Sequence, residues 1–359
     1  MKNKTNTNTL PTETQLNVKF SQIKLGVDVH ADSYRVVRQI DSATPQPAQK
    51  MSPEKFLEFV AKQLKLAAQV YSCYEAGPFG YQLHRQLVRL GVHNVVVRPQ
   101  NWDEHGRQVK TDKTDALALV QRLDRYVQGN HKALAVVAVP TPEQEQQRAL
   151  SRHREQLQKD RQCHEAQGRS LLLYSGRRIK GQWWKDAHWQ SLSKRLESWQ
   201  VPILENLRQL ILKADQLLEQ VSRQIESQAS TQPKGFGALT SEVLKREVLD
   251  WKRFNNRRQV ASMTGMCPAV RATGKRSISG PISKHGNPRL RRALVELAWR
   301  VVRYQPGYKP VSKWRPVLAN KSAGGGARKK AIVAIGRQLA IDLWRIQTGR
   351  CTAADLKLI

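Results

Sequence analysis

The chain from Lys24 to Ile40 has the sequence KLGVDVHADSYRVVRQI, in which apolar and polar side chains alternate on both sides of Ala31-Asp32. Alternation with a period of two is typical of strands with one buried face, and Ala31-Asp32 is a turn-forming pair. The stretch therefore predicts two antiparallel strands that open the fold.

The segments after this hairpin alternate between helical and strand patterns. We expect a helix near Pro53–Leu66, a strand VYSCYEA with Glu75 at its end, a helix from about Phe79 to Leu90 and a strand NVVVRP from Asn94. From Asp112 the run DKTDALALVQRLDRYV has the apolar spacing of an amphipathic helix that packs on a sheet. These patterns predict an α/β domain over residues 22–140, after a disordered lead-in over residues 1–21.

Helical patterns dominate the remainder of the chain. Residues 141–230 are rich in Glu, Gln, Arg, Lys and Leu, and the repeat ILENLRQLILKADQLLEQVSRQI fits either a coiled-coil arm or a two-helix hairpin within one subunit. Residues 231–359 predict a mainly α-helical C-terminal domain. There the stretch ATGKRSISGPISKHGNPRLRR, which starts at Ala272, predicts a glycine-, serine- and basic-rich loop before a helix. Gly235 and Gly237 fit a turn between helices or, alternatively, a turn that presents N–H groups to a phosphate.

The charge of the chain points to a polyanionic partner. The sequence holds 61 Lys and Arg against 29 Asp and Glu, a formal charge of +32. Such an excess repels itself unless a polyanion neutralises it, and nucleic acid is the first candidate. An anionic membrane is the rival, but no stretch of about 18 apolar residues exists. Four widely spaced cysteines and the polar N-terminus favour a reduced, cytoplasmic protein with neither a zinc site nor a disulfide framework.

Four carboxylates stand out from the structural pattern. Asp28 lies within the first strand, on the face opposite Leu25 and Val27, and Glu75 ends a later strand. Asp112 and Asp115 are three residues apart, which places both on one helix face. Taken one at a time, each has a structural interpretation. Asp28 fits an edge-strand or solvent-facing acid and Glu75 a strand terminator, and Asp112 with Asp115 fits an acid pair that complements the helix dipole.

Together, the four acids follow the order strand, strand end and helix that is expected of a ribonuclease-H-type nuclease. Clustered carboxylates repel each other unless divalent cations neutralise them, and hard oxygen ligands suit Mg²⁺ or Mn²⁺. Two such ions can activate an attacking oxygen and stabilise a leaving oxygen in phosphodiester displacement.

Several motifs resemble one known family, the DEDD insertion-sequence transposases, also called bridge-RNA-guided recombinases, with the related Piv-type DNA invertases. The resemblance covers nearly the whole chain after residue 22. The motifs are GVDVH, YEAGPFGYQLHRQL, VKTDKTDA, GMCP, GPISKHGNPRLRRALVELAWR and ARKKAIVAIGRQLAIDLWR.

The resemblance implies a RuvC-like N-terminal domain of ribonuclease-H type, a coiled-coil arm and a C-terminal transposase domain. It further implies Mg²⁺ at the four acids, an element-encoded guide RNA, donor and target DNA, and dimers that pair into tetramers at the bacterial nucleoid. A serine of the C-terminal domain would attack the scissile phosphate and form a covalent protein–DNA link.

This chain departs from the family where the serine is expected. Thr273, in RATGKRS, holds that place, and we expect its hydroxyl to be the nucleophile. Ser277 or Ser279 takes that role if the loop is shifted, and in a third interpretation the loop only contacts DNA backbone. The basic side chains nearby form either a solvated face or a phosphate clamp: Arg271, Lys275, Arg276, Lys284, His285, Arg289, Arg291 and Arg292.

Other interpretations of the chain stay open at this point. A junction resolvase would hydrolyse DNA with water and form no covalent link, and a nucleic-acid-binding protein that has lost catalysis would need no acids. Trp183, Trp184 and Trp189 fit either a helical core or stacking on unpaired RNA bases.

Overall fold

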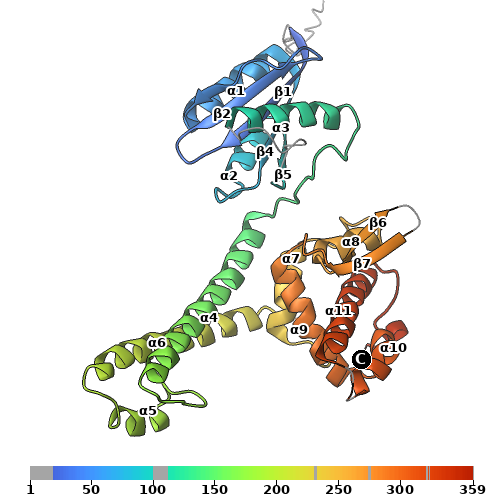
Figure 1. Cartoon of the computed structure of the whole chain (residues 1–359). Coiled ribbons are helices and arrows are strands. Elements are labelled where there is room, and N and C mark those ends of the chain that lie inside the picture. The colour runs from blue at the N-terminus through green and yellow to red at the C-terminus, as the bar shows by residue number, and fades with distance from the viewer. Residues whose placement is uncertain are drawn as a thin grey trace, which may run out of the picture. The chain divides into compact units, whose positions relative to one another are not determined.

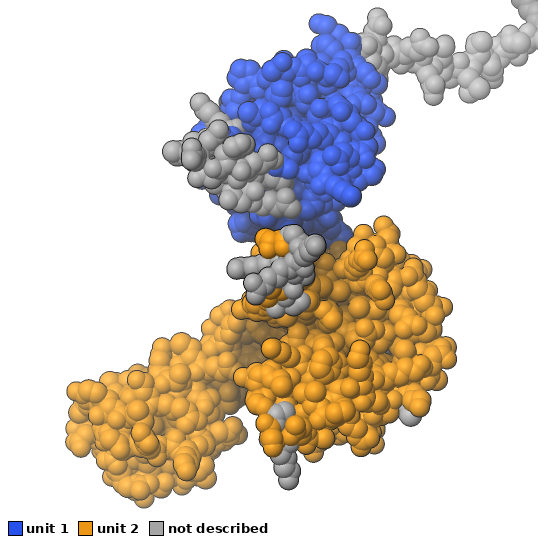
Figure 2. Space-filling view, turned by 45° about the vertical axis from the view of Figure 1, so that its right-hand side comes forward, with its two compact units in different colours: residues 1–139 blue, residues 140–359 orange. Residues whose placement is uncertain are grey.

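In the computed structural model of this chain, the predicted hairpin consists of β1 (Phe20–Val29) and β2 (Tyr34–Ile40), which pair in antiparallel register. The structure describes residues 19–99, 112–229, 233–273, 276–320, 322 and 324–358. The chain forms two compact units, residues 1–139 and 140–359, coloured separately in Figure 2.

The first unit is built on a mixed five-stranded sheet with the order β3-β2-β1-β4-β5. β3 (Gln49–Met51) pairs antiparallel with β2, whereas β4 (Ala67–Glu75) and β5 (His93–Val97) continue from β1 in parallel. The parallel strands require crossovers, which α1 (Pro53–Leu66) and α2 (Gln82–Arg89) supply. The predicted α/β unit is confirmed, and the short edge strand β3 was not predicted.

Helices cover both faces of this sheet (Figure 1). Ile23, Leu25 and Val27 of β1 pack in one core with Phe56 of α1 and Leu87 of α2. The opposite face lies under α3 (Asp112–Val127), whose Ala116, Val120, Leu119 and Leu123 are buried. α3 has the extent that the run DKTDALALVQRLDRYV predicted.

The contact between β1 and α3 is unusually close at Gly26. A Cβ atom at this position would stand 2.4 Å from the Ala116 carbonyl oxygen and 2.5 Å from the Val120 amide nitrogen. Two residues earlier, Lys24 Nζ forms an ion pair of 2.6 Å with Asp124. Lys24 therefore meets the end of α3, and Gly26 meets its middle, so that α3 runs antiparallel to β1.

The second unit starts with two long helices. α4 (Pro142–Tyr174) begins with a capping box between Thr141 and Gln144, and it packs on α6 (Gln200–Glu226) of the same chain. Trp183 and Trp184 are 0% and 1% exposed in the core between them, next to α5 (Asp186–Ser193). Their interpretation as core residues is confirmed.

The C-terminal part of this unit packs around α9 (Pro288–Tyr304) and α11 (Gly325–Gln347), which meet closely at Gly336 and Leu294. Around them lie α7 (Ala238–Val248), α8 (Arg257–Thr264), α10 (Lys309–Ala319) and a short 3-10 helix (Ala354–Leu356). In the described residues of either unit, no helix has both the length and the apolar character that crossing a membrane requires.

One predicted element is wrong. The stretch from Ala272, expected to be a loop before α9, belongs mostly to a hairpin of β6 (Pro268–Thr273) and β7 (Arg276–Ile282). The alternation that marks strands is hidden here because none of the apolar side chains described on these two strands is fully buried, with Val270 60% and Ile278 52% exposed. The hairpin is defined by the backbone pairing of β6 with β7, which amino-acid composition does not reveal.

The close contact at Gly26 gives a first testable prediction. Gly26→Ala should lower the free energy of unfolding by about 2 kcal/mol or more, because backbone atoms of α3 block the added methyl group. Gly77→Ala is the matched control, since the nearest atom to its Cβ lies 3.9 Å away. Urea unfolding followed by circular dichroism measures both variants, and equal stabilities would contradict the close contact.

Candidate functional site

Asp28 and Glu75 lie side by side on neighbouring parallel strands. The register pairs Val27 with Tyr74, and the next residues along β1 and β4 are Asp28 and Glu75. Adjacent strands run about 4.8 Å apart, so the two backbones are close neighbours. Both side chains are half-buried.

These two acids face the α3 side of the sheet. Side chains alternate along a strand, so Asp28 shares the face of Gly26, and Glu75 shares that of Cys73. Gly26 touches α3, and Cys73 Sγ donates to the Leu119 carbonyl oxygen at 3.5 Å. Burial, and then the charge of Glu75, raise the pKa of the Cys73 thiol, which is further evidence that this carboxylate lies near the α3 face.

The first turn of α3 lies at the same end of the layer. Because α3 runs antiparallel to β1 and its middle crosses Gly26, the helix start approaches the end of β1 that carries Asp28. Asp112 is the first residue of the helix, and Asp115, half-buried, is one turn further. The fold thus brings the four predicted positions to one end of the β1–β4–α3 layer, although the side chain of Asp112 lies outside the described residues.

One polar partner of Asp28 was not predicted. His30 Nε2 lies 3.1 Å from Asp28 Oδ2, and the His30 ring is about half exposed (51%). Among the side chains that the structure describes, no three or more of His, Cys, Asp and Glu form a group that could hold a metal ion. Asp112, the fourth predicted ligand, is not part of that comparison, so the metal site stays a prediction.

Thr273 occupies the last position of β6 and is exposed. It pairs with Arg276 across the hairpin, and the connecting residues, Gly274 and Lys275, lie outside the described residues. The same holds for the side chains of Arg271, Arg276, Ser277 and Ser279. The choice of Thr273, Ser277 or Ser279 as nucleophile therefore stays a prediction.

The motifs GMCP and SKHGNP build the base of this hairpin. The amide of Lys284 donates to the Gly265 carbonyl oxygen at 3.0 Å, and the amide of Asn287 donates to that of Met263 at 2.8 Å. A Cβ at Gly286 would stand 2.4 Å from the Gly265 nitrogen, so only glycine permits this approach. The hairpin is anchored at its base, and Thr273 lies at its other end.

The predicted basic clamp divides into exposed and paired residues. Lys284 and His285 are exposed, and Lys284 has a left-handed backbone with φ of 59°. Arg289 and Arg292 instead form ion pairs of 2.7 and 3.0 Å with Glu155 of α4.

Arg291 also has a structural role, since it donates to the Thr264 carbonyl oxygen at 3.2 Å. At Glu155, burial alone would raise the pKa, but hydrogen bonds from Lys159 and Arg289 and the charge of Arg292 lower it to about 2.

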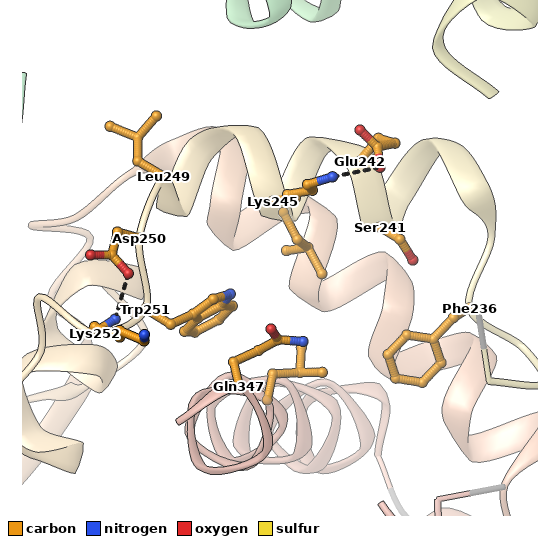
Figure 3. Close-up of a pocket in the computed structure, with 11 residues that line it drawn as sticks. Phe236, Ser241, Glu242, Lys245, Leu249, Asp250, Trp251, Lys252 and Gln347 are labelled. Carbon is orange, nitrogen blue, oxygen red and sulfur yellow. Dashed lines mark hydrogen bonds and ion pairs between the residues drawn. The ribbon is translucent and has the colours of Figure 1, made fainter. Parts of the chain in front are cut away.

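A hollow of about 420 Å³ between α7 and α11 was not predicted (Figure 3). Trp251 and Gln347 line it, and Lys245 forms an ion pair of 3.9 Å with Glu242 at its wall. The backbone at Leu249, on its rim, has a φ of 68°, a conformation that leucine rarely adopts. Its residues come from separate parts of the sequence, which is why no motif indicated it.

Known proteins resemble this chain both in its C-terminal segment and over most of its length. Residues 228–311, which include α7, α8, the hairpin and α9, match the family model described as Transposase IS116/IS110/IS902 family. The transposase y4rJ of Sinorhizobium fredii is 31% identical over 299 residues, which cover 76% of this chain and 75% of that relative. The transposase for insertion sequence element IS1111A of Coxiella burnetii is 23% identical over 354 residues, 92% of each chain.

Proposed function

This chain belongs to the IS116/IS110/IS902 family of insertion-sequence transposases, and from that premise we propose that it cuts and rejoins DNA strands at a metal-dependent carboxylate site. The observation that carries the proposal is that Asp28 and Glu75 are adjacent on β1 and β4, with the start of α3 directed toward the same end of the β1–β4–α3 layer. We further propose that this unit is of ribonuclease-H or RuvC-like type. Its sheet, with two antiparallel pairings beside two parallel ones, supports that assignment.

The donor atoms fit a hard divalent cation. Asp28, Glu75, Asp112 and Asp115 would hold Mg²⁺ or Mn²⁺ through carboxylate oxygens, which these ions prefer. Bound there, the ions would stabilise negative charge on the attacking and leaving oxygens of the scissile phosphate. The Asp28 carboxylate, with His30 beside it at 3.1 Å, would be oriented for this task before substrate binds.

The nucleophile in this proposal is the hydroxyl of Thr273. Its oxygen attacks phosphorus, the bond from phosphorus to one bridging DNA oxygen breaks, and that oxygen leaves as a DNA hydroxyl after taking a proton. A covalent threonine–phosphate link stores the bond energy until a second strand resolves it. The exposure of Thr273, beyond a hairpin base fixed by Gly265 and Gly286, supports this role.

We also propose an element-encoded guide RNA, an oligomeric state of dimer or tetramer, and action at the bacterial nucleoid. The formal charge of +32 supports a large polyanionic partner. The family resemblance supports both the RNA and the oligomer.

The carboxylate site is tested by substitutions that keep shape and remove charge. Asp28→Asn, Glu75→Gln and Asp112→Asn should each reduce strand cleavage at least a hundredfold, because the cation is lost while the phosphate-binding surface remains. Cleavage is measured on denaturing gels with DNA that carries the element's ends, and binding by gel shift. Asp32→Asn, in the exposed turn after β1, is the matched control and should cleave normally. Wild-type cleavage by any of the three variants would refute the metal site.

The nucleophile is tested by a pair of substitutions at one position. Thr273→Ala should abolish both the covalent adduct and recombination, whereas Thr273→Ser should keep or increase activity because the hydroxyl stays and the crowding methyl group goes. Digestion of the trapped adduct should give a peptide that carries phosphothreonine. Adduct formation by Thr273→Ala, but not by Ser277→Ala or Ser279→Ala, would move the nucleophile along the hairpin. Cleavage without any adduct would assign the attack to water.

A further inference from the structure

A second hollow in the C-terminal part of the chain is lined by five arginines and is here called the arginine hollow. It has a volume of about 680 Å³ and lies between the start of α8 and the last turns of α11. Its arginines are Arg257, Arg258, Arg337, Arg345 and Arg350. The residues that line it include no aspartate or glutamate.

Three of these guanidinium groups have no neutralising partner. In the described part of the chain, the side chains of Arg257, Arg258 and Arg337 form no hydrogen bond or ion pair. Arg257 and Arg258 are exposed, but Arg337 is half-buried, where an unpaired charge is more costly. This arrangement is unfavourable for the chain alone, because like charges in one hollow repel each other.

The other two arginines are held in place by the protein. Arg345 forms an ion pair of 3.2 Å with Asp342, a buried carboxylate (2% exposed) that also accepts from the Tyr308 hydroxyl at 2.7 Å. The guanidinium of Arg350 lies 4.1 Å from the ring centroid of Trp344, which is almost fully buried. These contacts fix two guanidinium groups before any ligand arrives, which lowers the entropy cost of binding.

The start of α8 adds a further attraction for anions. Asn256 caps the helix, and its side chain accepts from the amides of Arg258 and Gln259 at 3.0 and 3.1 Å. The N-terminus of a helix carries a partial positive charge. The hollow therefore combines a helix start with five guanidinium forks, each of which matches the oxygens of a phosphate group.

We propose that the arginine hollow binds two adjacent phosphates of a single nucleic-acid strand. Asp342 already balances the charge of Arg345. One phosphate would leave three of the other four charges unbalanced, whereas two consecutive phosphates bring them closer to balance within the available volume. A concave site also favours a strand that can bend into it over a stiff duplex. The inference rests on the proposed function for its ligand.

The test compares two triple variants that lose the same charge. The hollow variant is Arg257→Gln, Arg258→Gln and Arg337→Gln. The control is Arg303→Gln, Lys313→Gln and Arg315→Gln, at exposed positions on α9 and α10. Fluorescence anisotropy with a labelled 20-nucleotide single strand gives the affinity between 50 and 300 mM salt. In the hollow variant, the negative slope of log affinity against log salt should become shallower by about 1.4, which corresponds to the loss of two phosphate contacts on a single strand. The control should change the slope by less than half as much.

Thermal unfolding without nucleic acid separates this role from a structural one. The hollow variant should have an unchanged or higher Tm, since its substitutions remove repulsion, whereas a structural role predicts a lower Tm. If the triple variant does not fold, the double variant Arg257→Gln and Arg258→Gln, at exposed positions, is measured in its place. The expected change in its salt slope is half that of the triple variant.

Equal slope changes in the hollow variant and the control would overturn the proposal. A second result would also overturn it: sodium tripolyphosphate stabilises the wild-type chain but not the hollow variant, while the hollow variant binds the single strand as the wild type does. That result would assign the hollow to a small polyphosphate. Failure of the parent to bind any nucleic acid would instead refute the proposed function, and this inference with it.

Discussion

The close contact between β1 and α3 at Gly26 determines where the acidic residues of the first unit lie. Without a side chain at Gly26, backbone atoms of α3 come as near to the strand as van der Waals radii allow. The ion pair between buried Lys24 and Asp124 sets the direction of the helix over the sheet. With both constraints in place, the start of α3 has to approach the end of β1. Asp28 and the first residue of α3 therefore belong to the same end of this layer, although more than eighty residues separate them in the sequence.

A comparable close contact organises the C-terminal part of the second unit. Gly286 packs against Gly265, so that the two ends of the β6–β7 hairpin emerge from one anchored base. The GMCP and SKHGNP motifs therefore have a structural role, the anchoring of the hairpin base, that is independent of chemistry at Thr273. The ion pairs of Arg289 and Arg292 with Glu155 connect α9 to α4, so part of the basic charge stabilises the fold rather than facing a ligand. The unpaired arginines near α8 have no such structural role.

Local patterns predicted the first unit well. The alternation in β1 and β2, the proline and apolar spacing of α1 and the acid-led amphipathic run of α3 were sufficient to predict these elements. The motifs also predicted an insertion-sequence transposase, which the comparisons confirm. The β6–β7 hairpin was missed because its described apolar side chains, such as Val270 and Ile278, are exposed. The pairing of Arg289 with Glu155 was missed because 134 residues separate them. The arginine hollow was missed for the same reason, since it joins residues of α8 to residues of α11. Helices and strands can be predicted from residues that are close in the sequence. Surfaces that distant segments build together can be recognised only once the three-dimensional structure is known.

We propose that the end of the β1–β4–α3 layer holds divalent cations for strand cleavage. Titration of the full chain with Mn²⁺, followed by electron paramagnetic resonance of the free ion, measures this directly and needs no DNA substrate. We expect saturable Mn²⁺ binding by the wild-type chain and at least tenfold weaker binding by Glu75→Gln, with the circular dichroism of the two proteins unchanged. Equal Mn²⁺ binding by the two folded proteins, or none by the wild type at millimolar Mn²⁺, would rule out the metal site.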